Sequence, residues 1–114
     1  MFFAPGHDEP AATLDLPWGS TGTLIGGELR DPEAWRALAH AGARVVLGGA
    51  SEPQPLWTTT KRIAAGMSAA HGVVALVANR QGEEHGIEFA GEGLALAADG
   101  SPLAIEDGLV EIAL

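Results

Sequence analysis

Residues 21–49 constrain the fold of this chain more than any other segment. Residues 23–25 form a short apolar run that favours a β-strand, and a glycine pair, Gly26 and Gly27, follows it at once. Glycines allow a sharp turn with unusual backbone angles. We therefore predict a strand that ends in a tight elbow, which is where enzymes often carry a nucleophile. Here the elbow holds only glycine, and the whole chain contains no cysteine.

A capped helix and a second strand follow the elbow. Asp31 is a good helix cap, Pro32 suits the first helical position, and Gly42 suits a helix stop. Residues 44–47 then read as a strand that ends at the second glycine pair, residues 48–49. A strand–helix–strand unit predicts a parallel pair with a right-handed crossover. Both glycine pairs would then lie at strand carboxyl ends, where open α/β sheets place their ligands.

The rest of the chain alternates expected strands with one long helix. A continuous apolar run at residues 73–77 is typical of a buried strand. The helical pattern at 57–71 predicts one buried face, made of Ile63, Ala64, Met67 and Ala70. Further predictions are a strand at 13–16, loops at 51–55 and 81–86, strands at 87–89, 94–97 and 109–113, and a turn at 98–101.

The run at residues 24–33, Leu-Ile-Gly-Gly-Glu-Leu-Arg-Asp-Pro-Glu, resembles the cysteine loop of the carbon–nitrogen hydrolase family, the nitrilase and amidase superfamily. In that family the strand ends in isoleucine and cysteine. Any residue, an acidic residue, leucine, arginine, any residue, proline and glutamate then follow in that order. Gly26 stands where the family carries its nucleophilic cysteine. The rest of the pattern is kept by Glu28, Leu29, Arg30, Pro32 and Glu33.

Other segments resemble the family in the same order along the chain: residues 2–6, 16–19, 57, 77–82, 89–93 and 99–100. The ordered set implies an α/β fold that corresponds to roughly the second half of a nitrilase-like α-β-β-α sandwich. We expect an extended lead-in over residues 1–12 and the partial domain over 13–114.

The same resemblance implies an inactive member of the family. The family's cysteine works with a glutamate base and a lysine, and both would lie before the start of this chain. The charged residues of the helix after Trp57 are absent from residues 67–71, and the serine of a later turn is Gly93. We therefore expect no catalytic residue and predict hydrolysis of neither amides nor nitriles.

Residues beside the strand ends are candidates for a ligand pocket, and the resemblance implies an amide- or nitrile-like ligand. Glu28 is either a pocket acid or a structural acid that holds nearby backbone or Arg30. Asn79 either borders the crevice or is a loop asparagine that bonds backbone groups. The candidate set is Gly26, Gly27, Glu28, Arg30, Ser51, Asn79 and Arg80. No cofactor or metal site is expected.

Half a sandwich leaves one sheet face uncovered or one edge unpaired, and such surfaces invite association. The expected partner is therefore a second copy or a complementing N-terminal half. Three functions stay open: a degenerate module that binds or pairs with another subunit, a fragment of an active amide or nitrile hydrolase, and a stand-alone α/β domain that binds a small molecule.

The charge of the chain bears on its partners. Six Lys and Arg residues against fifteen Asp and Glu residues give a net charge of −9. An acidic chain is repelled by phosphate backbones and by anionic membrane surfaces, so neither nucleic acid nor a membrane is an expected partner. A cytoplasmic location is expected, and the family resemblance supports it.

Overall fold

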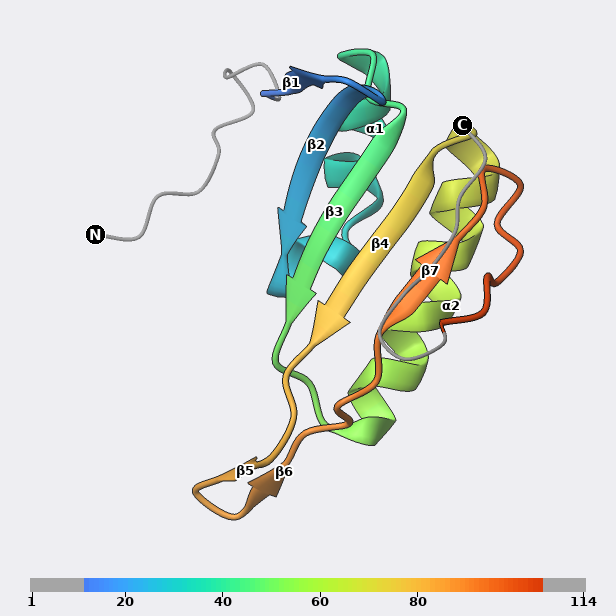
Figure 1. Cartoon of the computed structure of the whole chain (residues 1–114). Helices are drawn as coiled ribbons and strands as arrows, with labels where there is room; N and C mark the ends of the chain where they lie inside the picture. Colours follow the sequence, from blue (N-terminus) through green and yellow to red (C-terminus); the bar gives the residue numbers. More distant parts are fainter. Residues whose placement is uncertain (1–11, 106–114) are drawn as a thin grey trace.

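The computed structural model describes residues 12–105, which form a small α/β unit (Figure 1). Its elements in chain order are β1 (Leu14–Leu16), β2 (Gly19–Ile25), the 3-10 helix η1 (Gly26–Arg30), α1 (Pro32–His40), β3 (Val45–Ala50), α2 (Gln54–His71), β4 (Val74–Asn79), β5 (Glu83–Glu84), β6 (Ile87–Glu88) and β7 (Leu94–Leu96). The predicted α/β class is confirmed.

Five strands form one mixed sheet in the order β1-β2-β3-β4-β7. Strands β2, β3 and β4 are mutually parallel, with Thr21 opposite Val45 and Val45 opposite Val74. The edge strands β1 and β7 run antiparallel to their neighbours. The parallel pair predicted from residues 21–49 is therefore confirmed, and β4 extends it to a third strand.

The helices cover one face of this sheet (Figure 1). Alternate strand residues reach that face, because successive side chains of a strand point to opposite sides. Leu24, Val46 and Val77 pack there against residues of η1, α1 and α2. The buried side chains contributed by the three helices are Leu29, Trp35, Leu38, Trp57 and Ala64.

Two strand glycines let the helical layer approach the sheet closely. A Cβ added at Gly22 would lie 2.5 Å from Leu38 Cδ2 of α1. A Cβ added at Gly48 would lie 3.0 Å from Leu29 Cδ2 of η1. Leu38 and Leu29 therefore occupy the space that a side chain larger than glycine would need at Gly22 or Gly48.

The opposite face is exposed only in part, because Thr21, Val45 and Val74 on that side are buried. The strand register places Leu14, Thr23, Ile25, Leu47 and Leu76 on this side, which we call the open face. Leu14 is 68% exposed and Ile25 is 64% exposed, while Leu47 and Leu76 are half-buried. No helix within the described residues covers it (Figure 1).

Two predicted boundaries differ from the structure. The strand predicted to end at Gly48 and Gly49 continues one residue further to Ala50, and both glycines, paired with β2 and β4, lie at the carboxyl end of β3 as expected. The predicted loop at 81–86 contains β5, which pairs with β6 in a hairpin. His85 and Gly86 form its turn with φ angles of 51° and 79°, the left-handed values that a tight hairpin turn requires.

The long helix also differs from its prediction. It begins at Gln54, three residues before Trp57, because Pro53 and Pro55 occupy the positions at a helix start that tolerate proline. Its buried residues are Trp57, Thr60, Ala64 and Ser68. Of the predicted apolar face only Ala64 is fully buried, whereas Ile63 and Met67 are half-buried and Ala70 is exposed.

The remaining predictions concern the two ends of the chain. The strands near 13–16, 87–89 and 94–97 are confirmed as β1, β6 and β7, and the turn at 98–101 is confirmed. The lead-in at residues 1–11 and the strand at 109–113 lie outside the described residues.

Candidate functional site

An open hollow of about 680 Å³ lies at the carboxyl ends of β2, β3 and β4. This is the edge of a parallel sheet where ligands commonly bind, because the loops after the strands converge there. Its lining residues are Ile25, Gly26, Gly27, Arg30, Gly49, Ala50, Ser51, Glu52, Leu56, Ala78, Asn79 and Arg80.

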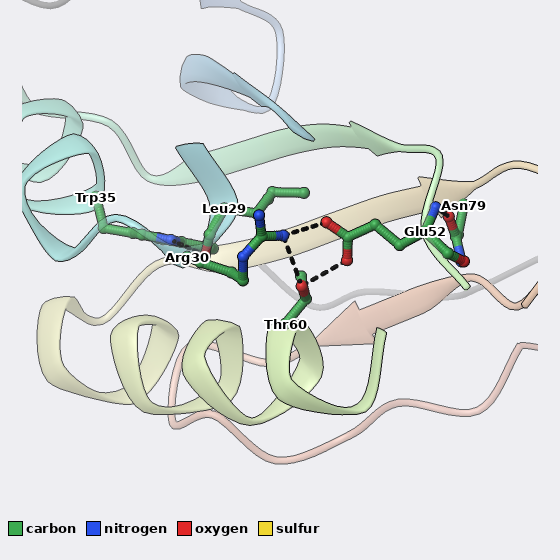
Figure 2. A network of polar contacts seen from close by, with 6 residues as sticks. All are labelled: Leu29, Arg30, Trp35, Glu52, Thr60 and Asn79. Carbon is green, nitrogen blue, oxygen red and sulfur yellow. Dashed lines mark hydrogen bonds and ion pairs between the residues drawn. The ribbon is translucent and has the colours of Figure 1, made fainter. Parts of the chain in front are cut away.

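A charged pair forms one wall of the hollow (Figure 2). Arg30, the last residue of η1, donates from Nη1 to Oε2 of Glu52, in the loop after β3. The same Nη1 donates to Thr60 Oγ of α2 at 3.3 Å, and Thr60 Oγ donates to Oε1 of Glu52 at 2.5 Å. Both oxygens of the buried Glu52 carboxylate therefore have a donor, which a buried charge requires.

Asn79 fixes the backbone of the same loop (Figure 2). Its Oδ1 accepts from the backbone N–H of Glu52 at 2.9 Å, and its Nδ2 donates to the Glu52 carbonyl at 3.1 Å. The amide thus joins the end of β4 to the loop that follows β3. Because both amide groups are occupied, Asn79 positions Glu52 and has the backbone-binding role that was one of its two predicted roles.

Trp35 of α1 fixes the end of η1 that carries Arg30 (Figure 2). Its Nε1 donates to the carbonyl of Leu29 at 2.9 Å, and both side chains are fully buried. This bond ties η1 to α1 one residue before Arg30. The Arg30 guanidinium therefore extends from η1, which is tied to α1 by Trp35 and to the loop after β3 and to α2 by the contacts of Arg30 itself.

The elbow itself is at Gly26, which has a φ of 57°. An L-residue incurs a steric penalty in this left-handed region, whereas glycine does not. Apart from its two chain neighbours, a Cβ added at Gly26 would meet no heavy atom of the described residues within 4 Å. The sharp bend predicted from the glycine pair is present, and there is room at it for a side chain.

The structure brings six of the seven candidate residues to one place. Gly26, Gly27, Arg30, Ser51, Asn79 and Arg80 all line the hollow. Glu28 does not line it; its Oε1 accepts from the backbone N–H of Ile25 at 2.9 Å, so it is an acid that holds backbone. Ligand binding by these residues stays a prediction.

Arg80 lines the hollow but is engaged elsewhere. Its Nη1 pairs with Glu84 of β5, and its guanidinium carbon lies 4.8 Å from the centre of the Phe89 ring. The ion pair is half-exposed on both sides, where such pairs contribute little to stability.

Sequence reasoning missed Glu52 and Thr60, which complete the ion pair. One signal was present: Glu52 lies two residues after the end of an apolar strand, in a chain position where a carboxylate must find donors. The sequence around Thr60 does not predict its role, because the burial of Thr60 depends on which face of α2 packs against η1.

Residues 12–105 contain neither a metal-binding cluster nor a membrane-spanning helix. Among residues 12–105, no group of three or more His, Asp or Glu side chains is placed to hold a metal ion. No helix in that range is long and apolar enough to cross a membrane.

Comparisons with known proteins were made with the sequence and with the structure. No protein-family model and no curated protein matches the sequence. Solved structures do match. A mutant of the amidase from Nesterenkonia sp. AN1, which carries an acetamide moiety added covalently at its active-site cysteine, is 26% identical with a TM-score of 0.78. The match covers 89% of this chain and 38% of that one.

Two further structures extend the comparison. A cysteine-to-alanine mutant of the same amidase, described as a member of the nitrilase superfamily, is 24% identical with a TM-score of 0.79, over 96% of this chain and 41% of that one. A carbon–nitrogen hydrolase from Helicobacter pylori G27 is 22% identical with a TM-score of 0.78, over 97% and 45%. The chain spans less than half the length of these structures.

Proposed function

Because this chain has the carbon–nitrogen hydrolase fold over the part of that domain which it spans, we propose that it is a non-hydrolytic member of the superfamily. It binds a small amide- or nitrile-like molecule in the hollow at the strand ends and pairs with a second polypeptide through the open face. We also propose a cytoplasmic location, which the family resemblance supports.

One observation supports the proposed absence of hydrolysis: the elbow beside the hollow is a glycine and has no side chain. The amidase neighbour adds its ligand at a cysteine, whereas this chain has glycine at the bend and no cysteine anywhere. A covalent step needs a nucleophilic atom with a base beside it. Gly26 offers no such atom, and both oxygens of Glu52 are already engaged by Arg30 and Thr60.

The pairing role rests on the open face. Ile25 and Leu14 are large apolar side chains that are mostly exposed on one side of a sheet. Burying apolar surface of this kind against another sheet is favourable by roughly 25 cal/mol per Å². Either a second copy of this chain or a complementing N-terminal half supplies that second sheet.

An amidase assay tests the proposal. Purified chain, incubated with acetamide, propionamide and propionitrile, is expected to release no ammonia above a buffer blank. The Gly26→Cys variant is expected to release none either, since a thiol alone lacks the positioned base that activates it. Ammonia release that scales with wild-type protein concentration would overturn the proposal and favour the alternative of an active hydrolase fragment.

A further inference from the structure

The ion pair with Glu52 leaves one edge of the Arg30 guanidinium, formed by Nε and Nη2, without a hydrogen-bond acceptor among the described residues. Within residues 12–105, only Nη1 of Arg30 has hydrogen-bond acceptors, and these are Glu52 and Thr60. The Arg30 side chain is 28% exposed. A Cβ added at Gly27 would meet Nη2 of Arg30 at 3.6 Å, so Nη2 lies beside the wall that Gly27 forms. Nε and Nη2 therefore have no acceptor within the described residues, and Nη2 is the donor that lies beside the wall of the hollow.

The other charged and amide side chains of the lining are already engaged. Glu52 has a donor on each oxygen, and Asn79 has both amide groups on the Glu52 backbone. Arg30 and Arg80 are the charged side chains of the lining that keep free donors in the described part of the chain. Arg80 pairs with Glu84 of the β5–β6 hairpin and lies over Phe89, whereas Arg30 is held at the hollow by Glu52 and Thr60. A ligand that enters the hollow meets a guanidinium edge as its strongest polar contact.

The rest of the lining is small or apolar. Glycines and alanines supply most of it, and Ile25 and Leu56 add aliphatic surface; the small residues are Gly26, Gly27, Gly49, Ala50 and Ala78. Such a surface suits a short aliphatic chain and offers a bulky polar group few partners.

We propose that the hollow binds a small aliphatic carboxylate, whose two oxygens accept from Nε and Nη2 of Arg30. The planar guanidinium edge matches a carboxylate with two parallel hydrogen bonds, and charge-assisted bonds of this kind are stronger than neutral ones. A single guanidinium in a chain of net charge −9 suits a monoanion better than a dianionic phosphate. This inference rests on the proposed function: it keeps the hollow as the binding site for a small amide-shaped molecule and assigns the carboxylate, which has the same shape as the amide, as the preferred ligand.

A titration with matched ligands tests it without any substitution. Sodium propionate and propionamide have the same size and shape and differ in charge. Backbone amide shifts of ¹⁵N-labelled chain are followed at low, constant ionic strength, with sodium chloride as the salt control. Both ligands are expected to saturate the shifts of Gly27 and Arg30, and propionate is expected to bind roughly tenfold more tightly because its bonds are charge-assisted.

The outcomes separate the two proposals. Equal or tighter binding of propionamide would overturn the carboxylate assignment and leave the proposed ligand-binding function intact. Saturation by neither ligand would overturn both. Equal shifts with sodium chloride would show a general ionic effect and would also overturn the assignment.

Charge-matched variants locate the binding to Arg30. Arg30→Gln and Arg36→Gln remove the same charge, but Arg36 is 69% exposed on α1 and, among residues 12–105, pairs only with Glu33. Arg36→Gln is expected to keep propionate affinity within about twofold, since exposed pairs matter little, whereas Arg30→Gln is expected to abolish saturation.

Arg30→Gln leaves the buried Glu52 unpaired, so its fold is checked by circular dichroism. If Arg30→Gln does not fold, the Arg30→Lys variant tests the assignment instead. Lysine keeps a cation beside Glu52 but lacks the planar edge with two donors. Propionate affinity is then expected to fall by about fivefold or more. Wild-type affinity in Arg30→Lys would overturn the assignment.

Discussion

Two glycines, Gly26 and Gly66, have equal space around an added Cβ but opposite backbone conformations. Neither would bring a Cβ within 4 Å of another heavy atom. Gly26 has a φ of 57°, whereas Gly66 lies within the right-handed helix α2. A substitution at each position therefore isolates the effect of backbone conformation.

Gly26→Ala is expected to lower the free energy of unfolding by about 1–2 kcal/mol, the steric penalty of the left-handed region for an L-residue. Gly66→Ala is expected to raise it by about 1 kcal/mol, because alanine is the better helix former. Urea denaturation followed by circular dichroism measures both. A Gly26→Ala variant as stable as Gly66→Ala would show that the bend at residue 26 is not left-handed.

At the scale of single residues, the sequence predicts where a side chain lies in the fold better than it predicts which residue that side chain bonds. Arg30 and Asn79 were expected near one another because each follows or ends a strand that reaches the same sheet edge, and both line the hollow. The acid that pairs with Arg30 is Glu52, 22 positions away, and not the nearby Glu28. Such a choice depends on how loops converge in space, which local patterns do not contain.

At the scale of elements, the face that α2 buries was predicted wrongly for a physical reason. Counting apolar residues selects Ile63 and Met67, but the helix buries Thr60 and Ser68 in full. Ser68 Oγ donates to the carbonyl of Val73 at 2.5 Å. A buried hydroxyl costs little once it is hydrogen-bonded, so hydropathy alone misplaces the face.

The contact between α1 and β2 gives a prediction for the helical layer. Gly22→Ala places a methyl group 2.5 Å from Leu38 Cδ2, so one of the two elements must shift. The variant is expected to lose about 1–3 kcal/mol of stability, the usual cost of overpacking a core. Thermal unfolding measures the loss.

A second strand glycine provides the control for this change. At Gly49, on the other face of the sheet, an added Cβ would meet Ile25 Cδ1 at an ordinary 3.7 Å. Gly49→Ala is expected to change stability by less than about 0.5 kcal/mol, as surface substitutions usually do. Equal losses at both positions would contradict the close packing of α1 on β2.

At the scale of the whole molecule, the described residues form a sheet with helices on one side only (Figure 1). The motif order predicted a partial sandwich, and the structural neighbours confirm the fold over less than half their length. The likeness was found from ordered short motifs, although no family model matches the sequence. What lies on the open face could not be predicted, because strand alternation shows which side is apolar but not what covers it.

The pairing proposal predicts that wild-type chain sediments as more than one copy unless a complementing half is supplied. Ile25→Lys introduces a charge on the open face and is expected to shift the chain toward monomer in sedimentation velocity, because a lysine resists burial without a partner. Ile87→Lys, which changes an exposed isoleucine on the β5–β6 hairpin, is the control and is expected to leave association unchanged. A monomeric wild type that also gains no mass with an N-terminal half would leave only the stand-alone binding domain.

The left-handed bend at Gly26 also limits how a chain like this one evolves. Acquiring a reactive side chain there would require tolerating a strained backbone before any chemistry rewards it, and small domains fold with little stability to spare. A prior change such as Gly66→Ala would supply a margin of similar size. The order of such mutations would therefore matter, with the remote helical substitution preceding the one at the bend.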